Sequence, residues 1–317
     1  MSNKWHWMPL LCCICLLLAA CGGASQGAQE KQMRKITYFG KEIEVPVKVE
    51  RTVAADTVVI EDLVMMDIPL VGGATYPDGP TPHLADKLKN MKSIGTETPN
   101  YEAILQLKPD LIFIIDRWSA TIIQQLRKIA PVIVMKGEGA GHGNIATPWK
   151  ENIRMLGEVY NKQARANEIL KEYQQKLATA KADLEKSPEK KQLVVMTMRI
   201  RGSGIYIYTR SGYINSVLYD DLGFPVPDVV KQAQGQDNLP LEKLAEIDPD
   251  VLYLQFAPQE NTNQPAALEN LQKNPLWTNL KAVKNGHAFI NKFPPLAWGS
   301  TSWSAVHALS VFEETLF

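Results

Sequence analysis

Three arginines, Arg117, Arg199 and Arg201, follow apolar segments of the chain and could bind an anion. An arginine keeps its charge at any physiological pH and presents a planar fork of N–H donors that suits oxyanions. If the chain stays extended from 199 to 201, Arg199 and Arg201 share one face, where like charges repel unless an anion lies near them. This spacing predicts an oxyanion-rich ligand. The alternative is pairing with nearby acids, which would be Asp116, Asp220 or Asp221.

Aromatic residues occupy comparable positions. Trp118 follows the first of these arginines, whereas Tyr76 and Trp298 lie in segments rich in proline and glycine. Flat apolar faces beside cationic donors suit an aromatic or planar ligand, although ordinary packing would also explain them. We therefore expect Tyr76, Trp118 and Trp298 to join the arginines in a ligand site. Packing is the expected role of three further tryptophans, Trp149, Trp277 and Trp303.

The chain has no motif that is typical of catalysis, so we expect neither an enzyme nor a bound cofactor. It lacks an HExxH pair, a P-loop and a GxGxxG segment. The histidines His83, His142, His287 and His307 are far apart and form no ligand-spaced cluster, so no metal site is expected. His142 could ligate a haem or be solvated. The sequence assigns no role to His83.

The elements that must position these residues predict an α/β fold. Residues 111–115 are a continuous apolar run, which is typical of a parallel strand covered on both faces, and residues 193–198 predict a further strand. Upstream, the pattern predicts a hairpin around Gly40, a strand over 52–55 and a helix over 58–66. Ligands of open α/β sheets bind at the carboxyl ends of the strands. The arginines therefore stand where a ligand would lie.

The longest helical pattern runs from about residue 162 to residue 186. Its apolar residues recur at spacings of four and seven, with charged residues between them, and are Ile169, Tyr173, Leu177 and Leu184. At about 1.5 Å per residue the helix would be roughly 35 Å long, about one domain diameter. Ser187-Pro188 ends it. We predict a spacer between two parts of the chain.

One motif recurs on each side of this helix: a glutamate seven residues before a Pro-Asp pair. Glu102 precedes Pro109-Asp110, and Glu242 precedes Pro249-Asp250. Each copy predicts a short helix, a turn and a buried strand. The repeat predicts two Rossmann-like lobes joined by the long helix. The expected segments are a signal at 1–20, a tether at 21–34, a first lobe at 35–161, the linking helix at 162–188 and a second lobe at 189–317.

The amino terminus has the pattern of a lipoprotein signal. Lys4 precedes an apolar stretch too short to span a bilayer, and Leu18-Ala19-Ala20 leads into Cys21. After cleavage Cys21 would carry a lipid and hold the protein on the extracytoplasmic face of the membrane. The alternative is an ordinary signal followed by a chance cysteine. The net charge is zero, and minus one without Lys4, so no global field favours nucleic acid.

Several segments together carry a resemblance to a known family. They are Met198-Arg199-Ile200-Arg201, Leu218-Tyr219-Asp220-Asp221, Asn274-Pro275-Leu276-Trp277, Trp149-Lys150-Glu151-Asn152 and Lys108-Pro109-Asp110. Through them the chain resembles the lipoprotein solute-binding subunits of iron-siderophore ABC importers, a group that includes cobalamin and haem binders. It is similar to the ferric-bacillibactin and enterobactin receptors of Gram-positive bacteria. The likeness extends over nearly all of the chain beyond the signal.

The resemblance implies the class III periplasmic-binding-protein fold and a ligand between the lobes. Arg117, Arg199 and Arg201 match the basic ligand contacts of the family. Glu102 and Glu242 match the glutamates that dock onto arginines of the permease. The expected protein is a monomer that captures a ferric siderophore and performs no chemistry on it.

One position departs from the family's pattern. Gln234 stands where catecholate-binding relatives place a lysine, and residues 96–98 lack an obvious lysine counterpart. An anionic catecholate siderophore is the expected ligand. Fewer cations leave room for a citrate-type or mixed carboxylate siderophore, and a hydroxamate, haem or cobalamin are further alternatives.

Overall fold

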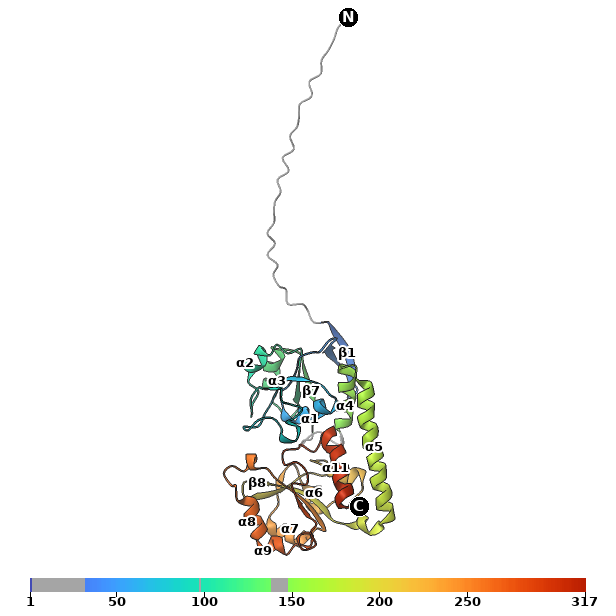
Figure 1. Cartoon of the computed structure of the whole chain (residues 1–317), viewed down its shortest axis with the longest axis vertical. Coiled ribbons are helices and arrows are strands. Elements are labelled where there is room, and N and C mark those ends of the chain that lie inside the picture. The colour runs from blue at the N-terminus through green and yellow to red at the C-terminus, as the bar shows by residue number, and fades with distance from the viewer. Residues whose placement is uncertain (2–31, 97, 138–147) are drawn as a thin grey trace. The chain divides into compact units, whose positions relative to one another are not determined.

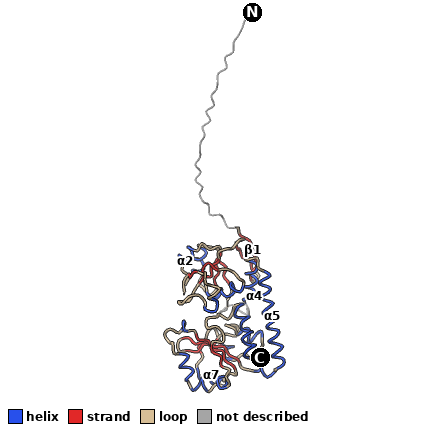
Figure 2. Tube along the Cα trace, viewed as in Figure 1, coloured by secondary structure: helices blue, strands red, loops and turns tan. Residues whose placement is uncertain are grey.

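The computed structural model describes Met1 and residues 32–96, 98–137 and 148–317. The expected signal, Cys21, most of the tether and His142 lie outside these residues. Residues Gln32–Phe317 form one compact unit. Most of its strands, drawn in red in Figure 2, gather into two separate five-stranded sheets. A hairpin precedes them, as predicted, and consists of β1 (Met33–Tyr38) and β2 (Lys41–Pro46).

The first sheet is parallel throughout and has the order β5-β4-β3-β6-β7. Its strands are β3 (Thr52–Ala54), β4 (Leu70–Gly73), β5 (Lys92–Ser93), β6 (Leu111–Ile115) and β7 (Val132–Met135). All five residues of β6 are buried. Leu111, Phe113 and Ile115 pack into one hydrophobic cluster, while Ile112 and Ile114 pack into another. The continuous apolar run is therefore a strand covered on both faces, as predicted.

The second sheet has the order β10-β9-β8-β11-β12. Its strands are β8 (Val195–Arg201), β9 (Gly204–Ile207), β10 (Asp237–Asn238), β11 (Val251–Phe256) and β12 (Ala288–Ile290). β8, β11 and β12 are parallel, whereas β9 returns antiparallel to β8. Because β8 includes residues 199–201, the extended backbone on which the arginine argument depended is confirmed.

Helices cover the sheets and connect them. We call the described chain before residue 163, with the first sheet, the first half, and the chain after residue 186, with the second sheet, the second half. The helices of the first half are α1 (Thr57–Met65), α2 (Tyr101–Gln106), α3 (Ala120–Arg127) and α4 (Pro148–Val159). Those of the second half are α6 (Asp228–Gln232), α7 (Leu241–Ile247), α8 (Ala267–Lys273), α9 (Pro275–Thr278), α10 (Lys281–Lys284) and α11 (Ser302–Thr315). In the described part of the chain, no helix combines the length and apolar character needed to cross a bilayer.

The predicted long helix is α5 (Gln163–Lys186), which runs beside both halves in Figure 1. Its buried residues include Ile169, Tyr173 and Leu184, and Leu177 packs at the edge of the core. At its start Lys162 Nζ donates to the carbonyl oxygen of Asp67 at 2.6 Å, after α1. The helix packs against α4 and then along α11. It therefore braces both halves as well as spacing them.

The repeated Pro-Asp pair has the same structural role in both sheets. Asp110 Oδ2 accepts a hydrogen bond from the backbone N–H of Arg51 at 3.0 Å, just before β3. Asp250 Oδ2 accepts one from Val194 at 2.8 Å, just before β8. Each aspartate also donates its own N–H back to the carbonyl of the same residue, at 2.8 and 2.9 Å. The repeat thus ties the starts of the two central strands of each sheet together.

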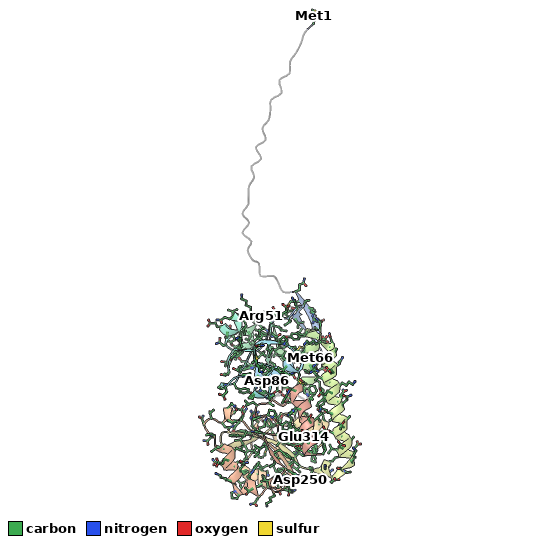
Figure 3. The ribbon with its side chains drawn as sticks, viewed as in Figure 1. Met1, Arg51, Met66, Asp86, Asp250 and Glu314 are labelled. Atoms are coloured by element: carbon green, nitrogen blue, oxygen red, sulfur yellow. The ribbon has the colours of Figure 1, made fainter. Side chains whose placement is uncertain are left out.

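The positions of these contacts also show how the two sheets are oriented. Figure 3 labels Arg51 and Asp250 near opposite ends of the folded part, so the amino ends of the central strands point away from each other. Their carboxyl ends point toward the space between the sheets. This is the edge at which α/β sheets bind ligands.

Helix α11 is anchored on two buried carboxylates of α1. Glu61 Oε1 accepts the backbone N–H of Trp298 at 3.1 Å, and Glu61 Oε2 accepts the hydroxyl of Ser304 at 3.0 Å. Asp62 Oδ1 accepts both the N–H and the hydroxyl of Ser302 at 2.7 Å. Carboxylates are favourable at a helix amino terminus, where backbone N–H groups are unpaired. The two halves are therefore held together by polar contacts beside the strand ends.

Candidate functional site

A cavity of about 220 Å³ lies at the carboxyl ends of both sheets. Ile115 and Arg117 line it from β6 and the residues that follow, and Arg199 lines it from β8. Tyr208, just after β9, and Trp298, just before α11, complete the wall. The structure therefore brings together three of the seven predicted ligand residues.

Arg117 is held by a deeply buried carboxylate. Its Nη2 lies 2.7 Å from Asp56 Oδ2, and the Asp56 side chain is 0% exposed while that of Arg117 is 44% exposed. The same oxygen accepts the indole N–H of Trp118 at 2.6 Å, and Asp56 Oδ1 accepts the N–H of Val58 at the start of α1 at 2.8 Å. The guanidinium also stacks 4.6 Å from the ring centroid of Trp298. Asp56 thus fixes an arginine, a tryptophan and a helix start.

Arg199 and Arg201 share a different carboxylate. Arg199 Nη2 lies 2.5 Å from Glu260 Oε2, and Arg201 Nη2 lies 3.5 Å from Glu260 Oε1. The exposed fractions are 5% for Arg199, 40% for Arg201 and 18% for Glu260. Arg199 lines the cavity, whereas Arg201 and Glu260 lie behind it and are not part of its wall. The three arginines face two carboxylates, so these five groups carry one excess positive charge.

These partners differ from those that the sequence offered as the alternative. Asp116 lies 3.2 Å from Lys136, Asp220 lies 2.7 Å from Arg210, and Asp221 accepts a hydrogen bond from Tyr173 at 2.5 Å. The three arginines do pair with internal acids, but with Asp56 and Glu260. Arg117 and Arg199 therefore each pair with a carboxylate and also line the cavity.

Tyr76 lies close to the second half of the site. The pKa of Tyr76 is raised to about 12, mainly by burial, with a hydrogen bond to Thr57 opposing the rise. The charges of Glu260 and Arg199 also act on this phenol, which places it within their electrostatic reach. Thr57 in turn accepts the indole N–H of Trp298 at 3.0 Å.

Besides Arg201 and Tyr76, two further predicted residues are absent from the wall of the main cavity. Trp118 lines a neighbouring cavity of about 50 Å³, together with Arg117 and Thr96. Gln234 is exposed, and its amide donates to the carbonyl oxygen of Gln232 at 3.2 Å. The residues after it, Gly235 and Gln236, line the main cavity in its place.

The sequence reasoning missed several residues of the site: Asp56, Tyr208, Tyr213, Gln236 and Glu260. Asp56 had a usable signal, because an aspartate before a predicted helix is a preferred amino-terminal cap. Glu260 had none, since it lies 59 residues from Arg201 in the sequence.

The two glutamates of the repeat occupy equivalent places away from the cavity. Glu102 lies in the first turn of α2 and Glu242 in the first turn of α7. Both side chains are exposed. Each helix leads through a Pro-Asp turn into a central strand, β6 or β11. The structure thus presents one carboxylate on the surface of each half.

His83 has a buried structural environment. Its Nε2 lies 3.0 Å from Glu61 Oε1, and its ring lies against Trp303 with 4.3 Å between centroids and a tilt of 37°. Burial lowers the pKa of His307, whose ring stacks on Trp303 with 4.7 Å between centroids. Among residues 32–96, 98–137 and 148–317, no three His, Cys, Asp or Glu side chains gather to hold a metal ion.

A larger cavity, of about 300 Å³, lies between β8, α7 and α8. Its wall includes Leu239, Leu241, Leu271, Asn238 and Asn270, and contains no charged side chain and none of the predicted ligand residues. The smaller cavity is the better candidate site, because charged and aromatic groups from both halves converge on it.

Comparisons with known proteins agree with the α/β fold. A family model described as periplasmic binding protein matches residues 53–294. An iron-uptake system-binding protein of Bacillus subtilis (strain 168) is 34% identical over 316 residues, which covers 97% of this chain and 96% of that protein. An Fe(3+)-citrate-binding protein of the same organism is 32% identical over 62% of this chain and 58% of that protein.

A solved structure is also similar. The triscatecholate siderophore binding protein FeuA of Bacillus subtilis, complexed with ferri-bacillibactin, has a TM-score of 0.80 and 33% identity. The match covers 89% of this chain and 98% of that chain.

Proposed function

Since this chain belongs to the periplasmic binding protein family, we propose that it is the substrate-binding component of an ABC importer and captures a ferric siderophore. Its α/β fold with parallel strands matches the class III structures of the family. The members are substrate-binding proteins, so the proposed role is binding followed by delivery, without a chemical step on the ligand.

One observation carries the proposal: guanidinium groups from both sheets face one cavity. Arg117 comes from the end of β6 and Arg199 from β8, and the ring of Trp298 lies against Arg117. Guanidinium groups bind oxyanions through paired, charge-assisted hydrogen bonds. Iron chelates with catecholate or carboxylate oxygens meet this requirement. Relatives named for iron uptake and for a triscatecholate siderophore support the assignment.

The preferred ligand is an anionic catecholate siderophore, with Arg117, Arg199, Arg201, Tyr76, Trp118, Trp298 and Gln234 around it. A citrate-type siderophore is the second candidate. It is favoured by the single excess positive charge at the arginines and by glutamine rather than lysine at position 234. A relative named for ferric citrate supports the same alternative.

The cavity must widen to accept such a ligand. Its volume of about 220 Å³ is below that of most small-molecule sites. The contacts of Trp298 with Glu61 and Thr57 cross the space between the halves. We expect ligand binding to move the two halves relative to each other around α5 and α11. The proposed boundaries of these lobes are 35–161 and 189–317, with 162–188 as the link.

The same proposal assigns the surface features. Cys21 would carry the lipid that tethers the protein to the extracytoplasmic face of the membrane. Glu102 and Glu242 would dock onto basic residues of the permease, because exposed carboxylates on separate helices can be recognised by complementary charge. The protein would act as a monomer.

The test is a tryptophan-fluorescence titration of the purified protein with four iron complexes in parallel. These are ferric bacillibactin, ferric schizokinen, ferric citrate and ferrioxamine. Trp298 lies against Arg117 in the cavity, so a bound chelate should quench its emission, and Trp298→Phe is the control for that signal. Saturable quenching by an anionic complex supports the proposal. Quenching by ferrioxamine alone, or by none of the four, would contradict it.

A further inference from the structure

We propose that Glu260 is a built-in counter-ion of the site: its carboxylate occupies Arg199 and Arg201 in the ligand-free protein, an anionic group of the ligand displaces it, and this exchange selects ligands by charge. The inference rests on the proposed function. It concerns a residue that contributes nothing to the cavity wall but holds two of the cations next to it.

The contacts show one carboxylate divided between two cations. Glu260 Oε2 lies 2.5 Å from Arg199 Nη2, while Glu260 Oε1 lies 3.5 Å from Arg201 Nη2. The two arginines share a face of β8, because one residue separates them on an extended strand. Their mutual repulsion needs an anion, and in the absence of a ligand Glu260 supplies it.

The backbone of the turn that carries Glu260 is held by contacts that do not involve the Glu260 carboxylate. Glu260 ends a short helical turn (Pro258–Glu260) that follows β11. The next residue, Asn261, is buried and donates from Nδ2 to the carbonyl oxygens of Ile200 and Ala257, at 3.2 and 2.8 Å. The backbone is therefore tied to β8. The carboxylate retains 18% exposure and can rotate away without disturbing that tie.

Two phenols face the same charges. Arg199, Arg201 and Glu260 all act on Tyr208, whose pKa burial raises, and Glu260 and Arg199 act on Tyr76. Both phenols are neutral at physiological pH and cannot replace the carboxylate as an anion. Displacement of Glu260 therefore requires an anion from the ligand.

This exchange has a consequence for selectivity, which is a difference of affinities between competing ligands. A neutral chelate cannot replace the carboxylate and must leave the ion pairs in place. A chelate with several anionic oxygens can replace both contacts at once. Glu260 thus lowers the affinity for every anion, and only a chelate that carries enough negative charge to displace it can reach both guanidinium groups.

The test compares Glu260→Gln with the wild-type protein by equilibrium titration with ferric bacillibactin, ferric citrate and ferrioxamine at two salt concentrations. Removal of the competing charge should tighten binding of the two anionic complexes about tenfold and steepen its salt dependence, and leave ferrioxamine unchanged. Glu42→Gln is the matched control, because it removes one exposed carboxylate from the β1–β2 hairpin. It should change neither affinity nor salt dependence.

A second variant keeps the test valid if Glu260→Gln folds poorly. Glu260→Asp retains the charge but withdraws it by one methylene, so it should give an intermediate gain in affinity. Weaker or unchanged binding of the anionic complexes by both variants would overturn the counter-ion role. If the wild-type protein bound none of the complexes, the proposed function would fail as well, so the two failures are distinguishable.

Discussion

Two carboxylates engage the arginines of the site, and they do so in different ways. Asp56 is completely buried, caps α1 and also binds Trp118, so three contacts hold it. Glu260 is partly exposed on a short turn, and its contacts with Arg199 and Arg201 are the only ones that the structure gives its side chain within the described residues. The first is a fixed anchor and the second is an exchangeable partner. The Asp56 side of the site is therefore preorganised, while the Glu260 side can exchange its carboxylate for an anion of the ligand.

The largest expected effect separates these two roles. Asp56→Asn must turn an amide N–H₂ toward one of three donors, because Val58, Arg117 and Trp118 already fill both oxygens. We expect the free energy of unfolding to fall by about 2–3 kcal/mol. Glu260→Gln should lower it less, by about 1–2 kcal/mol, because its amide oxygen can still accept from the buried Arg199 while its N–H₂ can face solvent beside the half-exposed Arg201. Urea denaturation of both variants measures this difference, and equal losses would contradict it.

The next effect concerns affinity. Arg199→Ala should weaken binding of a ferric tris-catecholate about 30- to 100-fold, because this guanidinium is buried at the cavity and poorly solvated. Arg117→Ala should weaken it about tenfold, since Arg117 is 44% exposed and partly hydrated. Titration of each variant against ferrioxamine is the control, and there little change is expected. A larger loss at Arg117 would reverse the proposed ranking.

Asp62 is a further buried carboxylate, and it extends the comparison because no basic side chain in the described part of the chain pairs with it. Burial raises the pKa of Asp62 to about 7, against the opposing hydrogen bonds from Ser302. A carboxyl group whose pKa is higher in the folded state binds a proton more readily when folded, so its stabilising contribution is lost as pH rises through 7. Between pH 5 and 8 the free energy of unfolding of the wild-type protein should therefore fall by about 2 kcal/mol more than that of Asp62→Asn.

Thermal denaturation of both proteins across this pH range measures that difference. His307 provides an opposing slope, because its lowered pKa favours the folded protein at higher pH. That slope is common to both proteins and cancels in the comparison. Parallel curves for the two proteins would contradict the assignment to Asp62.

The smallest expected effect belongs to Trp298. Trp298→Phe keeps a ring beside Arg117 but removes the N–H that binds Thr57 at 3.0 Å. We expect the affinity for anionic chelates to fall about threefold to fivefold, corresponding to roughly 1 kcal/mol. Trp277→Phe, at a buried position remote from the cavity wall, is the matched control. An equal loss of affinity in Trp277→Phe would contradict a role for Trp298 in ligand binding.

Much of the fold could be predicted from local patterns. The five apolar residues of β6 required cover on both faces, and they have it. The Glu-to-Pro-Asp repeat predicted two similar units, and Asp110 and Asp250 make matching contacts in the two sheets. These features depend on residues close in sequence, whose spacing determines which side of an element they occupy.

The partners of the arginines could not be predicted in the same way. Asp116 was a candidate because it precedes Arg117, but in the turn after β6 its Oδ1 accepts the N–H of Gly137 at 3.2 Å and its Oδ2 lies 3.2 Å from Lys136. Glu260 reaches Arg201 only because β11 lies beside β8 in the sheet. Sequence spacing carries no information on such a contact. The arginines were therefore predictable as a group, while their counter-ions required the sheet order.

The most direct test of the central claim is a crystal structure of the protein with ferric bacillibactin. The account predicts oxygens of the chelate within about 3 Å of the guanidinium groups of both Arg117 and Arg199, with the Glu260 carboxylate turned away and Asp56 unmoved. A chelate seated in the larger uncharged cavity beside α8, or one that touches neither guanidinium, would contradict it.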